Sequence, residues 1–108
     1  MTNLDRENLR HFLKRTDMYI NPVDQNNVVS FLHGYELGTG NKCQFTLLVR
    51  QLLTHKYRIV YSNDGWPGQI VRLAKNASGS WLTTFMEISA EIIGSEESTF
   101  VDNQEPKD

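Results

Sequence analysis

The residues best suited to chemistry are three histidines, one cysteine and scattered acids, and their spacing fits no common catalytic motif. His33 and Glu36 are three positions apart, so on a helix they would share a face, as ligands do in carboxylate metal bundles. Such a bundle repeats the pair on other helices, and this sequence has no second copy. We therefore expect both to be surface residues, and we expect no metal and no cofactor.

Cys43 is the only cysteine, so the chain cannot form an internal disulfide, and a cytoplasmic location is the default. Lys42 beside it could lower the pKa of the thiol. No general base can be placed next to it by sequence, so we interpret Cys43 as a partly buried structural residue. A small enzyme or ligand-binding domain around His33, Glu36 and Cys43 stays open as one alternative.

The charge of the chain is distributed unevenly. Residues 1–86 hold ten Lys or Arg and six Asp or Glu, whereas residues 87–108 hold one lysine and seven acids. The acidic end is either a solvated helix face with a loose tail or a surface for a basic partner. Direct nucleic-acid binding is not expected, because aromatic residues do not interleave with the basic ones and the pI is about 5.9.

Hydrophobic periodicity predicts the elements that position these residues. Five stretches carry apolar residues at helical spacing, which indicates a compact all-α bundle of about five helices in one domain, residues 1–94. Residues 95–108 are predicted to be an acidic flexible tail, with Gly94 ending the last helix. The charged start of the chain suggests no signal peptide, and no apolar run approaches the roughly 18 residues of a membrane span.

Helix starts can also be assigned from the sequence. Capping residues precede four of the five apolar stretches: Thr2, Asp24, Asp64 and Ser80. The expected buried stripes are Leu9, Phe12 and Leu13; Val28, Phe31, Leu32 and Tyr35; Phe45, Leu48, Val49, Leu52 and Leu53; Ile70, Leu73 and Ala74; and Trp81, Phe85, Ile88 and Ile92.

Residues 57–73 allow two interpretations. The segment 57–62, YRIVYS, predicts a strand, and a short β-hairpin over 57–73 is therefore an alternative. We prefer a helix that starts at Asp64 with Pro67 in its first turn, because Pro67-Gly68 disfavours a strand. Trp66 would then lie near the helix start, either half exposed and available to a partner or, as is more common there, buried as a lid on the core.

Several short motifs together resemble a known group of proteins. They are Lys14-Arg15, Met18-Tyr19-Ile20, FLHGY at 31–35, Gly65-Trp66 and Ser80-Trp81. The chain is similar to small bacterial immunity proteins of polymorphic or contact-dependent growth-inhibition systems, although Thr16 replaces a proline and Asn21 a frequent glycine of that pattern. The segment 12–20 is also similar to one in type II topoisomerase ATPase domains, but the magnesium-binding helix and ATP lid of those domains are missing.

The resemblance implies a non-enzymatic protein that binds and neutralises a cognate toxin. We expect the toxin to be a nuclease with a basic cleft, which an acidic surface would cover. The expected contact residues are Glu87 and Glu91, then Glu36, Asp64 and Trp66. A regulatory or adaptor module without a toxin partner is the alternative. Residues 18–20 would pack under the first two helices and would be a signature of the fold. Arg15 and Asp17 would stabilise the turn after the first helix, which we call the elbow, by an electrostatic contact.

Overall fold

The chain folds into five α-helices and one 3₁₀ turn, and no strand occurs along the described backbone. The fold is taken from a computed structural model that describes the backbone of residues 1–104 and the side chains of residues 1–94. Its elements are α1 (Asn3–Lys14), η1 (Thr16–Met18), α2 (Gln25–Gly38), α3 (Phe45–His55), α4 (Gly65–Asn76) and α5 (Trp81–Gln104). The all-α prediction is confirmed.

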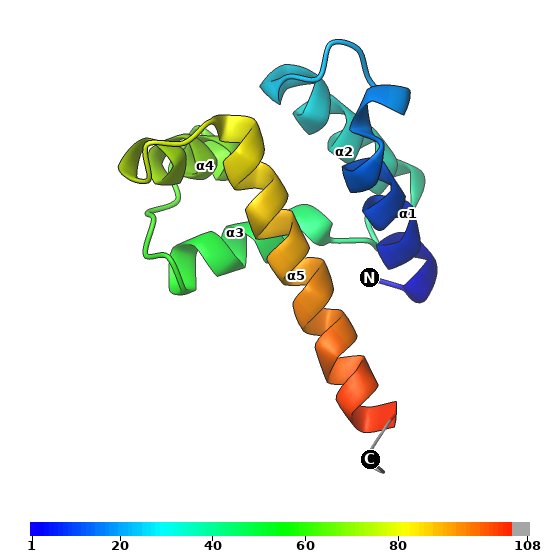
Figure 1. Ribbon diagram of the computed structural model, residues 1–108. Coiled ribbons are helices and arrows are strands. Elements are labelled where there is room, and N and C mark those ends of the chain that lie inside the picture. Colours follow the sequence, from blue (N-terminus) through cyan, green and yellow to red (C-terminus); the bar gives the residue numbers. More distant parts are fainter. Residues whose placement is uncertain (105–108) are drawn as a thin grey trace.

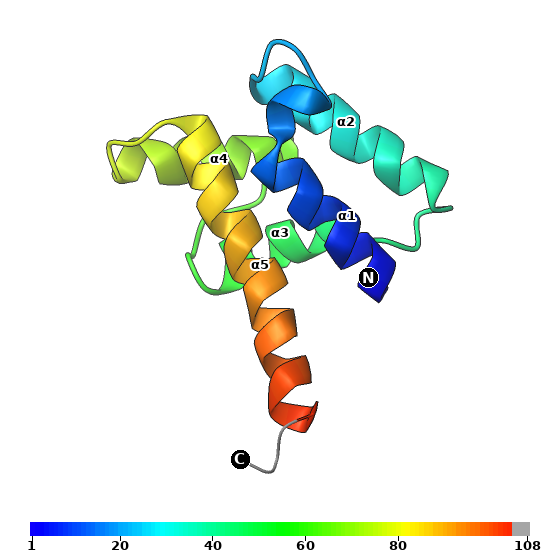
Figure 2. The same cartoon turned by 45° about the vertical axis from the view of Figure 1, so that its right-hand side comes forward.

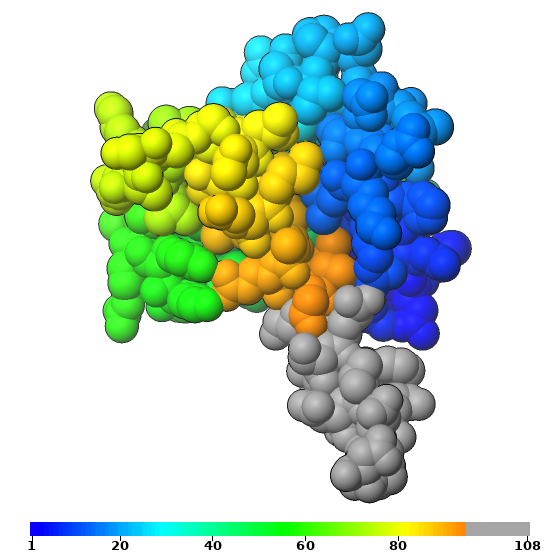
Figure 3. Space-filling view, viewed as in Figure 1, coloured from blue at the N-terminus to red at the C-terminus, as the bar shows by residue number. Residues whose placement is uncertain are grey.

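Helix α5 lies in front of α3, which crosses behind it, with α4 on the left in Figure 1 and α1 and α2 on the right. Figure 2 shows α1 and α2 side by side again, next to α5. We refer to α3, α4 and α5 as one side of the molecule and to α1 and α2 as the other. Helices α3, α4 and α5 pack against one another, and α1 contacts α5. The space-filling view shows the orange side chains of α5 between green α3 and blue α1 (Figure 3).

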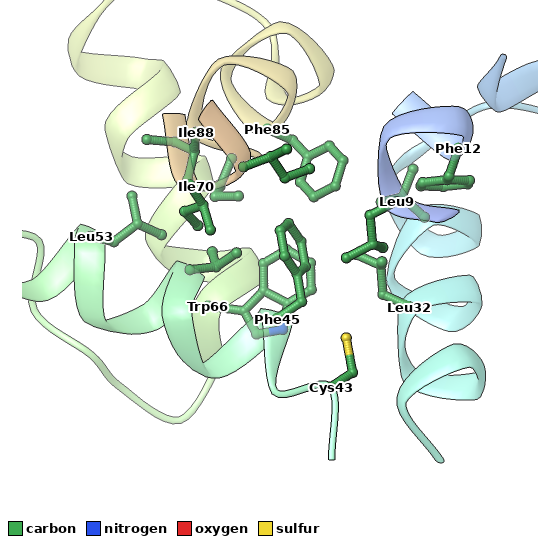
Figure 4. Close-up of a cluster of buried hydrophobic side chains, with 14 residues drawn as sticks. Leu9, Phe12, Leu32, Cys43, Phe45, Leu53, Trp66, Ile70, Phe85 and Ile88 are labelled. Carbon is green, nitrogen blue, oxygen red and sulfur yellow. The ribbon is translucent and has the colours of Figure 1, made fainter. Parts of the chain in front are cut away.

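One hydrophobic core joins the two sides (Figure 4). The predicted stripes supply most of it, because every helix buries the face that its apolar spacing defines. Phe45, Trp66 and Phe85 meet near its centre, facing side chains from α1 and α2. The buried apolar set is Leu9, Phe12, Val28, Leu32, Cys43, Phe45, Val49, Leu53, Trp66, Ile70, Ala74, Phe85, Ile88, Ile92 and Ile93.

Side chains cap three helices as predicted. The Thr2 hydroxyl accepts a hydrogen bond from the Asp5 amide at 3.0 Å, and the Asp5 carboxylate accepts one from the Thr2 amide. The Asp24 carboxylate accepts from the Asn27 amide at 2.9 Å. The Ser80 hydroxyl accepts from the Thr83 amide at 3.1 Å. These bonds satisfy backbone donors that a helix start leaves unpaired.

Of the two alternatives for residues 57–73, hairpin or helix, the structure has the helix, α4. The strand predicted over 57–62 is wrong, since this segment is an irregular connection in which Arg58 has a φ of 57°. Side chains of α4 hold it: Gln69 donates to the Ile59 carbonyl at 2.8 Å, and Arg72 donates to the Val60 carbonyl at 2.6 Å. These side-chain bonds replace the ladder of a hairpin.

The predicted helix end at Gly94 is also wrong, because α5 continues through Gly94 to Gln104. A glycine inside a helix costs only about 1 kcal/mol relative to alanine, so it does not force a stop. The flexibility expected of 95–108 stays a prediction, and residues 105–108 lie outside the described part of the chain.

The elbow after α1 differs in part from its prediction. Ile20 packs against the core, but Met18 is 66% exposed and does not tuck under the helices. Buried Thr16 holds the turn, because its hydroxyl donates to the Phe12 carbonyl at 2.7 Å. Arg15 and Asp17 are both exposed and form no ion pair there. The residue that replaces the proline of the family pattern is thus a structural hydrogen-bond donor.

Candidate protein-binding face on α3 and α5

An open groove lies between α3 and α5, with a volume of about 370 Å³. Successive turns of α3 contribute one wall and the last described turns of α5 contribute the other. The lining residues are Leu48, Gln51, Leu52, His55, Lys56, Glu91 and Ile92. The floor is therefore apolar and the rim polar, a composition typical of protein-binding surfaces.

Glu91 is the best-ordered acid on this rim. Its carboxylate accepts a hydrogen bond from the Tyr57 hydroxyl at 2.7 Å and forms an ion pair with Lys56. The hydrogen bonds from Lys56 and then Tyr57 outweigh the effect of burial and hold the pKa of Glu91 below its ordinary 4.5. Glu91 is therefore a carboxylate at neutral pH, fixed in orientation by two partners.

Glu87 lies one turn before Glu91 on α5, and its side chain is exposed. Its negative charge acts on Tyr57, the partner of Glu91. The pKa of Tyr57 is raised first by its hydrogen bond to Glu91 and by burial, and Glu87 adds a smaller contribution. The Glu87 carboxylate forms no hydrogen bond or ion pair within residues 1–94. We call the groove together with Glu87 the α3–α5 face.

Glu36 does not belong to this face, although it was predicted as a contact residue. Its carboxylate accepts from the Thr46 amide and from the Thr46 hydroxyl, both at 2.7 Å. The residue preceding α3, Gln44, has a left-handed backbone and provides no side-chain cap. Glu36 from α2 therefore caps α3, and its negative charge suits the positive end of the helix.

Asp64 and Trp66 lie at the start of α4, away from the lining of the groove. Asp64 pairs with Arg72 at 2.9 Å and packs against Gly68, where an added Cβ would come within 1.9 Å of the Asp64 carboxyl carbon. Of the two interpretations of Trp66, the structure supports the buried one, since only 6% of the residue is exposed. Its ring packs against Trp81 and Phe85 in the core.

The residues singled out for chemistry are not brought together. The Cys43 thiol is fully buried, more deeply than predicted, and burial raises its pKa, which lowers its reactivity at neutral pH. His33 is exposed, while Glu36 is engaged at α3. Within the described residues, no three His, Cys, Asp or Glu side chains are placed to hold a metal ion. None of the described helices is long and apolar enough to cross a membrane.

The sequence analysis missed Lys56 and Tyr57, which orient Glu91. Both residues follow α3 directly, and their link to α5 spans more than thirty positions of sequence, so no local pattern could show it. The burial of Trp66 agrees with its spacing, because it lies four residues before Ile70 and eight before Ala74 on the same helix stripe.

The fold and this face define a small all-α domain in which the groove between α3 and α5 has an apolar floor and a mixed polar rim of Gln51, His55, Lys56 and Glu91. The chain matches no protein-family profile, no curated protein sequence and no solved structure.

Proposed function

We propose that this chain is an immunity protein, which binds a cognate bacterial toxin and blocks its active site with the α3–α5 face. One observation carries the proposal: Glu91 lines an open groove with an apolar floor, and Glu87 lies exposed one helical turn away on the same helix. The resemblance of the short motifs to immunity proteins supports the toxin as the kind of partner. A nuclease fits best, because its phosphate-binding cleft must be basic.

The groove would supply most of the affinity. Leu48, Leu52 and Ile92 form an apolar floor that an aliphatic or aromatic side chain of the toxin could fill. Because such a side chain would exclude water from the groove, the charge interactions at the rim would become stronger. Glu91 offers a carboxylate held in place by Tyr57, so little side-chain entropy is lost when a cationic group approaches it.

Glu87 would mainly steer the encounter. An exposed charge on the rim of an interface changes the association rate and its salt dependence more than it changes the contact energy. Lys56 compensates part of the charge of Glu91, whereas Glu87 has no ion-pair partner within residues 1–94. Glu87 is therefore the residue through which the long-range attraction of this face can be altered without disturbing the fold.

The test is co-expression with the protein encoded directly upstream in the native genome. Growth should stop when that neighbour is expressed alone and should resume when this chain is present. Glu87→Lys should weaken protection, whereas Glu7→Lys, an equal charge change at an exposed site on α1, should not. A harmless neighbour that still binds would replace immunity by the adaptor function, and a lethal neighbour that is not rescued would refute the proposal.

A further inference from the structure

A smaller cavity lies between α1, the elbow and α2, away from the α3–α5 face. Its volume is about 120 Å³, and it is more enclosed than the groove. Three of its five lining residues are aromatic: Tyr19, Phe31 and Tyr35, joined by Asn8 and Leu9. The aromatic residues come from the MYI and FLHGY motifs, so two motifs separated in sequence converge on one cavity.

The rings around this cavity are fixed relative to one another. Phe31 and Tyr35 are one turn apart on α2, with centroids 6.5 Å apart and planes inclined by only 15°. Tyr19 approaches Phe31 edge-on, at 5.6 Å and 64°. Phe12 stacks on Phe31 at 4.2 Å and anchors it to the core. Three aromatic rings thus line the cavity, two of them near-parallel and the third edge-on to Phe31.

The polar groups at the cavity hold Tyr35 in place and bring a negative charge close to it. The Tyr35 hydroxyl donates to the Asp5 carboxylate at 2.7 Å and accepts from the Asn8 amide at 3.1 Å. Asp5 is 6% exposed. A carboxylate that accepts from a phenol increases the electron density of the ring, and electron-rich faces attract cations.

We propose that this aromatic cavity binds an alkylated ammonium group, such as a trimethylammonium head. The size of the cavity admits a compact head group, and an alkylated ammonium matches both properties of the walls. Its methyl groups make apolar contact with the rings, and its charge is attracted by their faces. Tyr19 is 47% exposed, so one wall of the cavity borders solvent and gives a ligand access.

The test uses choline and tetramethylammonium as probes of the full chain, followed by NMR. Both should shift resonances of Tyr19, Phe31 and Tyr35 saturably, with a dissociation constant on the order of 1 mM. The neutral isostere of choline, with carbon in place of the nitrogen, should bind at least about tenfold more weakly, since it lacks the cation–π attraction. Equal binding of the neutral isostere, or no saturable shift, would overturn the proposal.

Variants localise the effect. Tyr19→Leu should weaken choline binding at least about tenfold, because it removes a wall of the cavity. Tyr61→Leu is the matched control, an aromatic residue of similar exposure under the guanidinium of Arg50, and it should bind as the parent does. Unchanged binding in Tyr19→Leu would also overturn the proposal.

The source of the ammonium group is settled by a final comparison. A peptide with trimethyl-lysine that binds more tightly than choline would assign a methylated protein. Tighter binding of choline would assign a free small molecule. Both results uphold the site, and both are independent of the toxin assay, because that assay changes no residue that lines the aromatic cavity.

Discussion

The two sides of the molecule are held together in different ways. Helices α3, α4 and α5 bury continuous apolar stripes against one another. Helices α1 and α2 instead meet through long side chains: Phe12 stacks on Phe31, and Tyr35 bonds to Asp5. The first kind of packing resists local change, whereas the second depends on a few directional contacts. We therefore expect helices α3, α4 and α5 to form the more stable part of the domain, and helices α1 and α2 to unfold locally more easily.

The largest effect should come from Phe85, a fully buried residue of α5. Phe85→Ala should lower the free energy of unfolding by about 3–5 kcal/mol, because it removes a fully buried ring that touches Trp66 and Trp81. Urea unfolding monitored by tryptophan fluorescence measures this loss. Phe85→Leu, the control, should lose less. A loss below about 1 kcal/mol for the alanine variant would contradict the packing described for α4 and α5.

Asp5→Ala should destabilise mainly helices α1 and α2. Its carboxylate completes the cap of α1 and accepts from Tyr35, and such charged hydrogen bonds are each worth about 1.5–3 kcal/mol. Hydrogen exchange should become faster in α1 and α2 and stay unchanged in α3–α5. Uniformly faster exchange would remove the distinction between the two sides.

The effect of Asp5 should also depend on pH. Burial raises its pKa, but hydrogen bonds from Tyr35 and Thr2 outweigh burial and place it below the ordinary 3.8. The charged form is thus favoured in the folded state. Its stabilisation is present above pH 3.8 and is lost as the pH falls through the folded pKa. The stability difference between the parent and Asp5→Ala should accordingly shrink in acid.

Glu36→Ala tests the connection between the two sides, since a residue of α2 caps α3. Loss of both bonds to Thr46 should cost about 1–2 kcal/mol, the usual value of a helix cap. Glu36→Gln keeps an acceptor for the Thr46 amide and should cost less. Thermal unfolding of the two variants separates the contribution of the hydrogen bonds to stability from that of the negative charge. Equal stability of both variants and the parent would show that α3 needs no cap from α2.

The smallest effect on stability should come from Glu91→Gln. Lys56 is 58% exposed at the side chain, so solvent screens the ion pair and its contribution to stability is small. Because the pKa of Glu91 is lowered, this contribution is present above pH 4.5 and is lost in more acidic solution. Urea unfolding at low and high salt measures it. A loss comparable to that of Asp5→Ala would make the α3–α5 face a structural element as well as a binding surface.

Local patterns predicted most of the fold. Caps such as Thr2 and Asp24, and stripes such as Val28 and Leu32, depend on neighbours within four residues, so the sequence displays them directly. The failures lie where distant contacts override local preference. Residues 57–62 have strand-like composition, but Gln69 satisfies their backbone. Gly94 is a common stop signal that α5 passes through.

The candidate site was predicted only in part for the same reason. The spacing of Glu87 and Glu91 placed them one turn apart on the last helix, as found. Glu36 and Asp64 looked equally available in the sequence, but each is bound by a partner within the fold: Glu36 accepts hydrogen bonds from Thr46, and Asp64 pairs with Arg72. The exposure of an acid is a tertiary property, and only the structure separates Glu87 from the acids that hold the domain together.

The most direct test of the central claim is the affinity for the purified upstream-encoded protein, measured at several salt concentrations. The parent chain should bind more weakly as salt rises, because attraction to the α3–α5 face is electrostatic. Glu87→Lys should weaken binding about tenfold at low salt and flatten the salt dependence, while Glu7→Lys should match the parent. Equal affinity and equal salt dependence for all three proteins would contradict the assignment of this face as the toxin-binding surface.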